Sequence, residues 1–255
     1  MKSSPAQPLI YLCWVAKMIF TTPNPDNTNN ASSDFNNDCL GIVLAGGLSS
    51  RMGQDKSLLS RNDMKMLDYS KKLLSDIGIK NMVVSGPFES ENHQVLTSDI
   101  LVPDTIKQGG PVAGIYSVLQ RFQPKAVFIL PVDLPLMTPK VLQQLKITGE
   151  LSNKACFFQA SDGAHNIPLY LPNNAYLALF LADAFKQTES NESGLNKKTA
   201  KKGARKDAKK GPSMKSLLKQ VPHESIVAPN TKTFNDALFN TNTPEQWQLA
   251  SKKFG

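Results

Sequence analysis

The chain has 255 residues, of which 40% are hydrophobic and 7% aromatic, so its composition indicates a globular protein with a core of ordinary domain size. Its formal net charge is +8, but ten Lys or Arg and three Asp or Glu lie between Lys186 and Lys215, a local net charge of +7. The other residues together carry only +1, which argues against a folded body built to bind nucleic acid.

Three cysteines, Cys13, Cys39 and Cys156, are odd in number and widely spaced. This usage fits neither a disulfide framework nor a zinc site, so it predicts a protein of the reducing cytoplasm. Residues 9–16 are apolar, but Lys17 ends the run before it reaches the roughly 20 residues of a membrane span.

Residues 1–37 are expected to be a disordered or dispensable leader, because residues 21–38 are polar and rich in Asn. Met18 is an alternative start. A signal peptide is the other interpretation, although no small-residue cleavage site follows the apolar run.

Short apolar runs alternate with amphipathic stretches from residue 38 to the end of the chain. Strands alternating with helices of about ten residues imply parallel βαβ units with helices on both sheet faces. The sequence therefore predicts a single α/β domain over residues 38–255 with a mostly parallel central sheet. Strands are expected at 41–45, 81–85, 126–130, 155–158, 167–171 and 226–227, with a short further strand beginning at 95–97. Helices are expected at 67–77, 114–122, 138–145, 174–186 and 213–219, and from Thr243 onward.

Residues 187–211 interrupt this alternation. They consist mainly of Lys, Ala, Gly, Ser and Asn and contain almost no large apolar side chain, so they cannot bury enough surface to order themselves. A flexible basic insertion in the domain is predicted here.

The run GIVLAGGLSSRMGQDK, residues 41–56, carries the strongest chemical signal. A buried strand leads directly into Gly46 and Gly47, which expose backbone N–H groups to an anion because no Cβ shields them. Arg51 and Lys56 add positive charge beside these amides. The run matches neither the P-loop nor the dinucleotide-binding glycine pattern. It predicts a phosphate-binding loop at the carboxyl end of a strand, and hence a nucleotide ligand.

Two further segments are expected at the same edge of the sheet. In QGGPVAGI, residues 108–115, paired glycines permit close backbone approach and Pro111 starts a helix. In LPVDLP, residues 130–135, Asp133 follows a hydrophobic strand, where a carboxylate needs a cation beside it. Asp133 is therefore a candidate ligand for Mg²⁺, which keeps waters and bridges phosphate oxygens.

The run LAGGLSSRMGQDK resembles the signature of nucleotidyltransferases that join a nucleoside monophosphate to a phosphorylated acceptor. Within them it is most similar to the molybdenum cofactor guanylyltransferases. Sugar nucleotidyltransferases usually follow their glycines with Gly-Thr-Arg-Leu, and cytidylyltransferases acting on molybdopterin usually have Ala-Ala-Gly where this chain has Ala45-Gly46-Gly47. The resemblance spans residue 40 to the C-terminus apart from the insertion, and it implies a three-layer, Rossmann-like nucleotidyltransferase fold.

The resemblance also implies roles for individual residues. Asp104 matches the position that contacts the nucleotide base, and a carboxylate can accept from N1–H and the N2 amino group of guanine together. Relatives often carry Asn where this chain has Ser85. Nucleotide-binding residues are then Leu44, Ala45, Gly46, Gly47, Lys56, Ser85, Asp104 and Asp133, and the catalytic residues are Arg51, Lys56 and Asp133, with Asp133 as the metal ligand.

The acceptor-binding candidates are His165, Asn240 and Asn242. The family often carries a His-Pro pair, whereas here Asn166 and Ile167 separate His165 from Pro168, and a surface-loop histidine is the alternative. For the two asparagines, in FNTNTPE at residues 239–245, the alternative is that the segment simply starts a helix.

The implied reaction transfers GMP from GTP to the terminal phosphate of molybdopterin, with Mg²⁺ as cofactor and pyrophosphate as the second product. The alternatives are a cytidylyl- or sugar-phosphate nucleotidyltransferase, a catalytically inactive nucleotide sensor, and a nucleic-acid or anionic-surface binding module acting through the basic insertion. We expect a cytoplasmic monomer that contacts molybdoenzymes or other cofactor-synthesis proteins transiently, with neither nucleic acid nor membrane as a partner.

Overall fold

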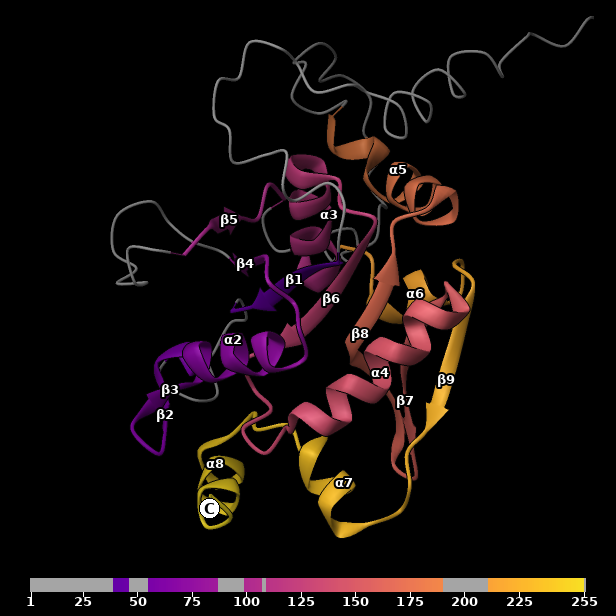
Figure 1. Ribbon diagram of the computed structural model, residues 1–255. Coiled ribbons are helices and arrows are strands. Elements are labelled where there is room, and N and C mark those ends of the chain that lie inside the picture. Colours follow the sequence, from indigo (N-terminus) through magenta and orange to yellow (C-terminus); the bar gives the residue numbers. More distant parts are fainter. Residues whose placement is uncertain (1–38, 46–54, 87–98, 107–108, 190–210, 255) are drawn as a thin grey trace, which may run out of the picture.

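The computed structural model describes residues 39–45, 55–86, 99–106, 109–189 and 211–254. A seven-stranded sheet lies between two layers of helices (Figure 1), with the strand order β5-β4-β1-β6-β8-β7-β9. The strands are β1 (Cys39–Leu44), β4 (Met82–Gly86), β5 (Leu101–Pro103), β6 (Ala126–Pro131), β7 (Ala155–Ala160), β8 (Gly163–Pro172) and β9 (His223–Val227). The predicted α/β class with a mostly parallel central sheet is confirmed.

Strand β8 is antiparallel to both of its neighbours, β6 and β7. Only two residues, Ser161 and Asp162, separate β7 from β8, and so short a connection can join only antiparallel strands. The other adjacent pairs in the sheet are parallel. The expectation of parallel βαβ units is therefore wrong at this one strand.

The helices cover both faces of the sheet, as predicted. One face packs against α3 (Gly110–Phe122), α5 (Ala175–Glu189) and α6 (Met214–Leu218). The opposite face packs against α2 (Met66–Asp76), α4 (Pro139–Ser152) and α7 (Lys232–Ala237).

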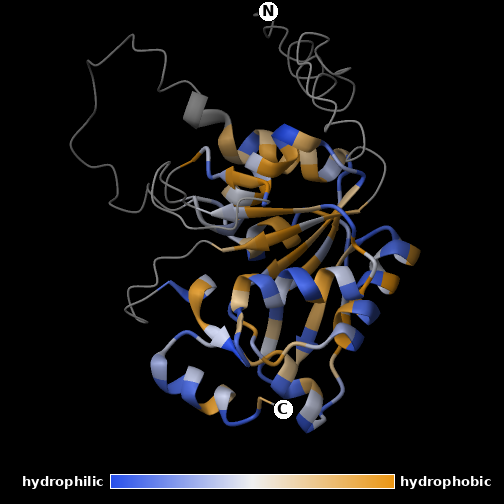
Figure 2. Ribbon diagram, turned by 60° about the vertical axis from the view of Figure 1, so that its left-hand side comes forward, coloured by the Kyte–Doolittle hydropathy of each residue, from blue (hydrophilic) through white to orange (hydrophobic). Residues whose placement is uncertain are grey.

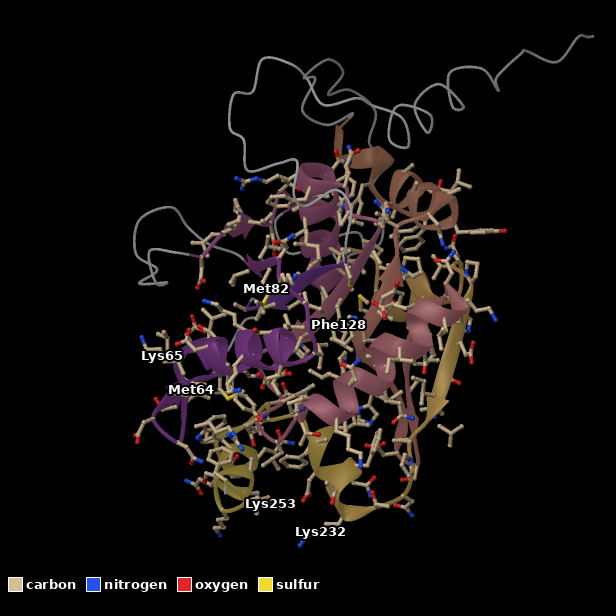
Figure 3. All side chains as sticks on the ribbon, viewed as in Figure 1. Met64, Lys65, Met82, Phe128, Lys232 and Lys253 are labelled. Carbon is tan, nitrogen blue, oxygen red and sulfur yellow. The ribbon has the colours of Figure 1, made fainter. Side chains whose placement is uncertain are left out.

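Alternating side chains of the strands fill these two cores. On β1, Ile42 and Leu44 join the core under α3, whereas Val43 joins the core under α2. Phe128 of the central strand β6 is completely buried on the α2 side (Figure 3). Figure 2 shows the hydrophobic strands enclosed by helices whose polar faces point outward. The strands from β5 to β7 in the sheet order thus contribute to both cores, which fixes their register, whereas the edge strand β9 contributes only Ile226, on the α2 side.

Several short elements were not predicted. A hairpin of β2 (Ser60–Arg61) and β3 (Met64–Lys65) follows the 3₁₀ helix η2 (Lys56–Leu58). Strand β5 is a further short strand that none of the expected ranges covers. The expected strand at 95–97 lies outside the described residues. Helix α7 is also additional, and α4 runs seven residues beyond its predicted end.

The expected start of α4 needs a correction. Thr138 occupies the N-cap position, but its side chain makes no capping hydrogen bond there. Helix α5 continues to Glu189, into the first residues of the predicted insertion. Residues 190–210 lie outside the described part, and so do residues 1–37, the predicted leader. Within the described residues, no helix combines the length and hydropathy that crossing a bilayer requires.

Four parallel neighbours, β5, β4, β1 and β6, end at one edge of the sheet. Because β8 is antiparallel to β6, it begins at this same edge. Residues that follow the four strands, and those that open β8, therefore gather here.

Candidate active site

Lys56 begins the short helix η2 and lies eleven residues after Ala45, the last residue described after β1. Asp55 caps this helix, since its Oδ1 accepts from the Ser57 backbone N–H at 2.9 Å and from the Ser57 hydroxyl at 2.8 Å. The cap fixes the turn that presents Lys56 toward the end of β6.

Lys56 lies between two oxygen-bearing side chains that are far away in the sequence. Its Nζ donates to Oδ1 of Asn242 at 2.7 Å and lies 3.5 Å from Oδ2 of Asp133. The Lys56 and Asp133 side chains are only 16% and 18% exposed, so water screens their ion pair weakly. The structure therefore joins three of the predicted site residues in one contact group.

Asp133 follows the last strand residue of β6 by two positions. Burial raises the pKa of its carboxyl, while the charge of Lys56 and the Asn240 side chain oppose that rise. Oδ1 of Asp133 is buried and has no hydrogen-bond partner among the described residues. A buried carboxylate oxygen without a partner is costly, and a bound cation would satisfy it.

The oxygen atoms around Lys56 suit a hard divalent cation. Asp133 offers a carboxylate and Asn242 an amide oxygen, which are ligand types that Mg²⁺ accepts, while the Asn240 side chain hydrogen-bonds to the Asp133 carboxylate. Within the described ranges, no three His, Cys, Asp or Glu side chains lie close enough to form a metal cluster. A cation here would thus take its remaining ligands from water or from a phosphorylated substrate.

The segment that carries the two asparagines is held at both ends. Thr241 is buried, and both its N–H and its hydroxyl donate to the backbone carbonyl of Asp133, at 2.9 and 3.1 Å. Thr243 then opens α8 (Pro244–Ser251) with a capping box that involves Gln246. The segment 239–245 therefore starts a helix and also contributes side chains to the site.

Helix α8 also packs on the hairpin that follows Lys56. Trp247 packs against Leu59 and Met66, and the Arg61 guanidinium lies over the rings of Tyr69 (4.4 Å) and Phe254 (5.2 Å). Figure 3 shows the hairpin, marked by Met64 and Lys65, and the C-terminal turn, marked by Lys253, at the same end of the molecule. These contacts tie the C-terminal helix to the segment that presents Lys56.

A second polar group lies at the ends of β4 and β5. Ser85, fully buried in β4, donates its hydroxyl to Oδ1 of Asp104 at 3.3 Å. Burial raises the pKa of Asp104, and the hydrogen bond from Ser85 opposes part of the rise. Gly114 of α3 packs directly against this pair, because a Cβ there would lie 2.6 Å from Ser85 Oγ and 3.2 Å from Asp104 Oδ1.

The end of β1 lies between these two groups, since β1 pairs with β4 on one side and β6 on the other. Leu44 is the last residue of β1, and its carbonyl accepts from the Val132 N–H at 3.3 Å. The Ala45 N–H donates to the carbonyl of Ser85 at 2.9 Å. Gly46, Gly47 and Arg51 of the predicted loop lie outside the described residues.

His165 lies on β8 at the same edge of the sheet, but its ring contacts Asp162, with Nε2 2.9 Å from Oδ1. The structure thus places it within the β7–β8 hairpin, apart from the Lys56 contact group. Two residues of the site, Gly114 and Thr241, were not predicted from the sequence. A glycine inside an otherwise apolar helix, where alanine would be favoured, was the available signal for Gly114.

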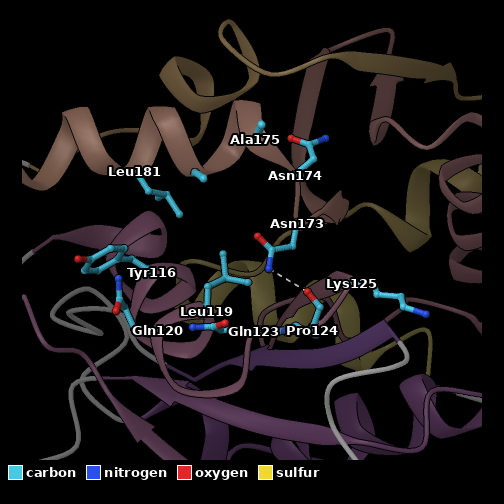
Figure 4. A pocket seen from close by; sticks show the side chains of 11 residues that line it. Tyr116, Leu119, Gln120, Gln123, Pro124, Lys125, Asn173, Asn174, Ala175 and Leu181 are labelled. Atoms are coloured by element: carbon cyan, nitrogen blue, oxygen red, sulfur yellow. Dashed lines mark hydrogen bonds between the residues drawn. The ribbon is translucent and has the colours of Figure 1, made fainter. Parts of the chain in front are cut away.

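A well-formed cavity lies elsewhere. It has a volume of about 240 Å³ and lies at the opposite edge of the sheet, between the end of α3 and the start of α5 (Figure 4). Asn173 closes one side of it by donating to the Pro124 carbonyl at 2.9 Å. Its lining contains none of the predicted site residues.

Comparison with solved structures supports the fold. A protein of Archaeoglobus fulgidus whose title is molybdopterin-guanine dinucleotide biosynthesis protein A superimposes with a TM-score of 0.60, at 19% identity, over 84% of this chain and 97% of that one. A Mycobacterium tuberculosis protein solved in complex with manganese gives a TM-score of 0.52 at 13% identity, over 85% and 99% of the two chains.

Sequence comparison identifies the family. A molybdenum cofactor guanylyltransferase of Xanthomonas euvesicatoria is 36% identical over 106 residues, which are 41% of this chain and 52% of the relative. The chain thus spans about half the length of that curated relative. The model of the MobA-like NTP transferase domain matches residues 41–200, which include the glycine-rich run, Lys56, Asp104 and Asp133. The chain therefore belongs to the family of MobA-like NTP transferase domains.

Proposed function

We propose that this protein transfers GMP from GTP to the terminal phosphate of molybdopterin, which gives the guanine dinucleotide form of the cofactor and pyrophosphate. The observation that carries the proposal is the contact group of Lys56 and Asp133, whose Oδ1 is buried without a described partner. Such a pair at the carboxyl ends of parallel strands suits a metal–triphosphate complex.

In the proposed reaction, an oxygen of the acceptor's terminal phosphate attacks the α-phosphorus of GTP. The new P–O bond forms as the bond from the α-phosphorus to its bridging oxygen breaks, and pyrophosphate leaves with the electron pair. The nucleophile and the leaving group are both phosphate anions, so no general base is required. Positioning and neutralisation of charge then account for most of the catalysis.

Lys56 is the residue proposed to stabilise the charge of the transition state and the departing pyrophosphate. It already lies in a weakly screened site, where a fixed positive charge acts strongly on a developing negative one. Arg51 is proposed to share this role, and the backbone amides of Gly46 and Gly47 to bind the nucleotide phosphates. The expectation that the Ala45 amide takes part needs a correction, because its N–H already donates to the Ser85 carbonyl at 2.9 Å.

Asp133 is proposed to hold Mg²⁺, with Asn240 and Asn242 nearby. When bound, the cation would neutralise negative charge on the phosphates of the substrate. The unpartnered Oδ1 of Asp133 and the two neighbouring amide side chains are the features that support this assignment. His165 stays a candidate for the acceptor side, on the strength of its place at the same edge.

The base-binding role falls to Asp104 and Ser85. A carboxylate at Asp104 would accept from the N1–H and N2 amino group of guanine, which adenine does not offer together. Gly114 of α3 packs closely against both side chains and so helps to fix their positions. The name of the Xanthomonas relative agrees with guanine as the base.

Incubation of the purified protein with GTP, Mg²⁺ and molybdopterin tests the proposal, with chromatographic detection of a guanine dinucleotide and of pyrophosphate. Parallel reactions with CTP, ATP and UTP test the base, and a reaction without acceptor controls for simple hydrolysis. A dinucleotide formed from CTP and none from GTP would refute guanylyl transfer while keeping nucleotidyl transfer. Absence of any product from all four nucleotides would refute the enzymatic assignment.

A further inference from the structure

Asp133 lies in a turn, beyond the ladder of hydrogen bonds that holds β6 in the sheet. On its N-terminal side, the Val132 N–H donates to the Leu44 carbonyl at 3.3 Å, which ties the turn to β1. On its C-terminal side, the carbonyl of Asp133 itself accepts two hydrogen bonds from Thr241. The position of the carboxylate therefore depends on these contacts.

Two hydrogen bonds from Thr241 restrain the Asp133 carbonyl more than a single bond would. A carbonyl oxygen has two lone pairs, and here the N–H at 2.9 Å and the hydroxyl at 3.1 Å occupy both. One bond limits the distance between the two segments, whereas two bonds from different atoms also limit rotation of the peptide group after Asp133. Thr241 is only 1% exposed, so water cannot replace the hydroxyl.

Thr241 is also the centre of the segment that supplies the two amides. The Asn240 side chain hydrogen-bonds to the Asp133 carboxylate, and Oδ1 of Asn242 accepts a hydrogen bond from Lys56. Behind them, Oε1 of Gln246 accepts from the N–H groups of Asn242 and Thr243, at 2.7 and 3.1 Å. The segment is thus anchored on α8 at one end and on Asp133 at its middle.

We infer that Thr241 is a positioning residue for Asp133: its hydroxyl orients the turn that carries the carboxylate and keeps Oδ1 directed at the cation. The inference rests on the proposed function, because it takes Asp133 as the metal ligand. Loss of a residue that orients a metal ligand typically lowers metal affinity or activity by roughly 10- to 100-fold.

The test compares Thr241→Val, which removes the hydroxyl at nearly constant shape, with Thr241→Ser, which keeps it. Ser70→Ala is the matched control, because Ser70 is 2% exposed and its hydroxyl also donates to one backbone carbonyl, that of Met66 at 2.9 Å. Binding of Mn²⁺ to the full chain in the presence of GTP is measured by electron paramagnetic resonance, together with kcat, KM and the melting temperature.

Thr241→Val is expected to weaken Mn²⁺ binding and lower kcat by roughly 10- to 100-fold, the effect typical of a lost outer-sphere partner. Thr241→Ser is expected to keep Mn²⁺ binding and kcat close to the wild-type values, and Ser70→Ala is expected to change neither of them. Equal Mn²⁺ affinities for Thr241→Val and the wild type would overturn the inference, as would losses in Thr241→Ser as large as those in Thr241→Val. Failure of the wild type to form the dinucleotide while it binds Mn²⁺ with GTP would overturn the proposed acceptor reaction instead.

Discussion

Replacement of Gly114 by alanine is expected to damage nucleotide binding without weakening the helix that carries it. The new Cβ would lie 2.6 Å from Ser85 Oγ, closer than real Cβ contacts, and 3.2 Å from Asp104 Oδ1. Within α3, alanine is favoured over glycine by about 0.5–1 kcal/mol, which offsets part of the steric cost. The protein should therefore stay folded.

The Ser85 hydroxyl can avoid the new methyl group only by rotating, because the residue is 1% exposed and lies within a strand. Rotation breaks its 3.3 Å hydrogen bond to Asp104. The freed Asp104 carboxylate must be ordered again when guanine binds, at a cost close to the about 1.5–3 kcal/mol that a hydrogen bond to a charged group contributes, so the affinity for GTP should fall roughly 10- to 100-fold.

Isothermal titration calorimetry with GTP and Mg²⁺ measures this affinity, and thermal unfolding measures stability. Gln120→Ala, at an exposed position of the same helix, controls for a change in helix propensity and is expected to bind GTP as the wild type does. An affinity of Gly114→Ala within about twofold of the wild type, well below the expected effect, would refute the placement of the base beside Ser85 and Asp104.

Three further predictions concern other parts of the molecule. Lys56→Ala is expected to lower turnover of GTP by at least ~100-fold, whereas Lys65→Ala, exposed on β3, leaves it unchanged; equal losses in both variants would contradict the role of Lys56. Gly149→Ala places a Cβ 2.2 Å from Tyr170 Cδ1, so the free energy of unfolding should fall by about 1–3 kcal/mol and the melting temperature by roughly 2–10 °C, measured by circular dichroism; an unchanged melting temperature would refute this packing. Binding of GTP is expected to weaken as pH falls through the pKa of Asp104, which burial raises, because only the carboxylate accepts from guanine. Ser85→Ala removes the hydrogen bond that lowers this pKa, so the loss of binding should move to higher pH. Coincident profiles of GTP binding against pH for the wild type and Ser85→Ala would contradict the assignment.

The long elements could be predicted from the sequence because their patterns are strong. Strands β1 and β6 are continuous apolar runs, as expected for strands covered on both faces. Thr243, Pro244 and Gln246 mark the start of α8 by the residues of a capping box. In these cases local preference and tertiary packing favour the same structure.

The short elements could not be predicted in this way. Strands β2 and β3 have two residues each, too few for any periodicity, and the turn between them places Asn62 and Asp63 at positive φ. Asparagine followed by aspartate is a weaker turn signal than asparagine followed by glycine. Strand β8 was assigned correctly as a strand but in the wrong direction, because direction depends on the connection rather than on the strand's own residues.

In the site, too, some residues could be predicted from the sequence and others could not. Lys56 and Asp133 were both expected at the carboxyl edge of the sheet, since each follows a buried strand. The contact between Lys56 and Asn242 joins residues 186 positions apart, which no spacing rule reveals. Thr241 was missed because a threonine before a helix start carries no signal for a buried pair of hydrogen bonds to a distant carbonyl.

A crystal structure of the protein with Mg²⁺ and a non-hydrolysable GTP analogue tests the central claim most directly. We expect Mg²⁺ about 2.1 Å from Oδ1 of Asp133, with Lys56 on a phosphate oxygen and the guanine beside Asp104. A bound Mg²⁺–nucleotide complex that leaves Asp133 without the metal, and still paired with Lys56, would contradict it.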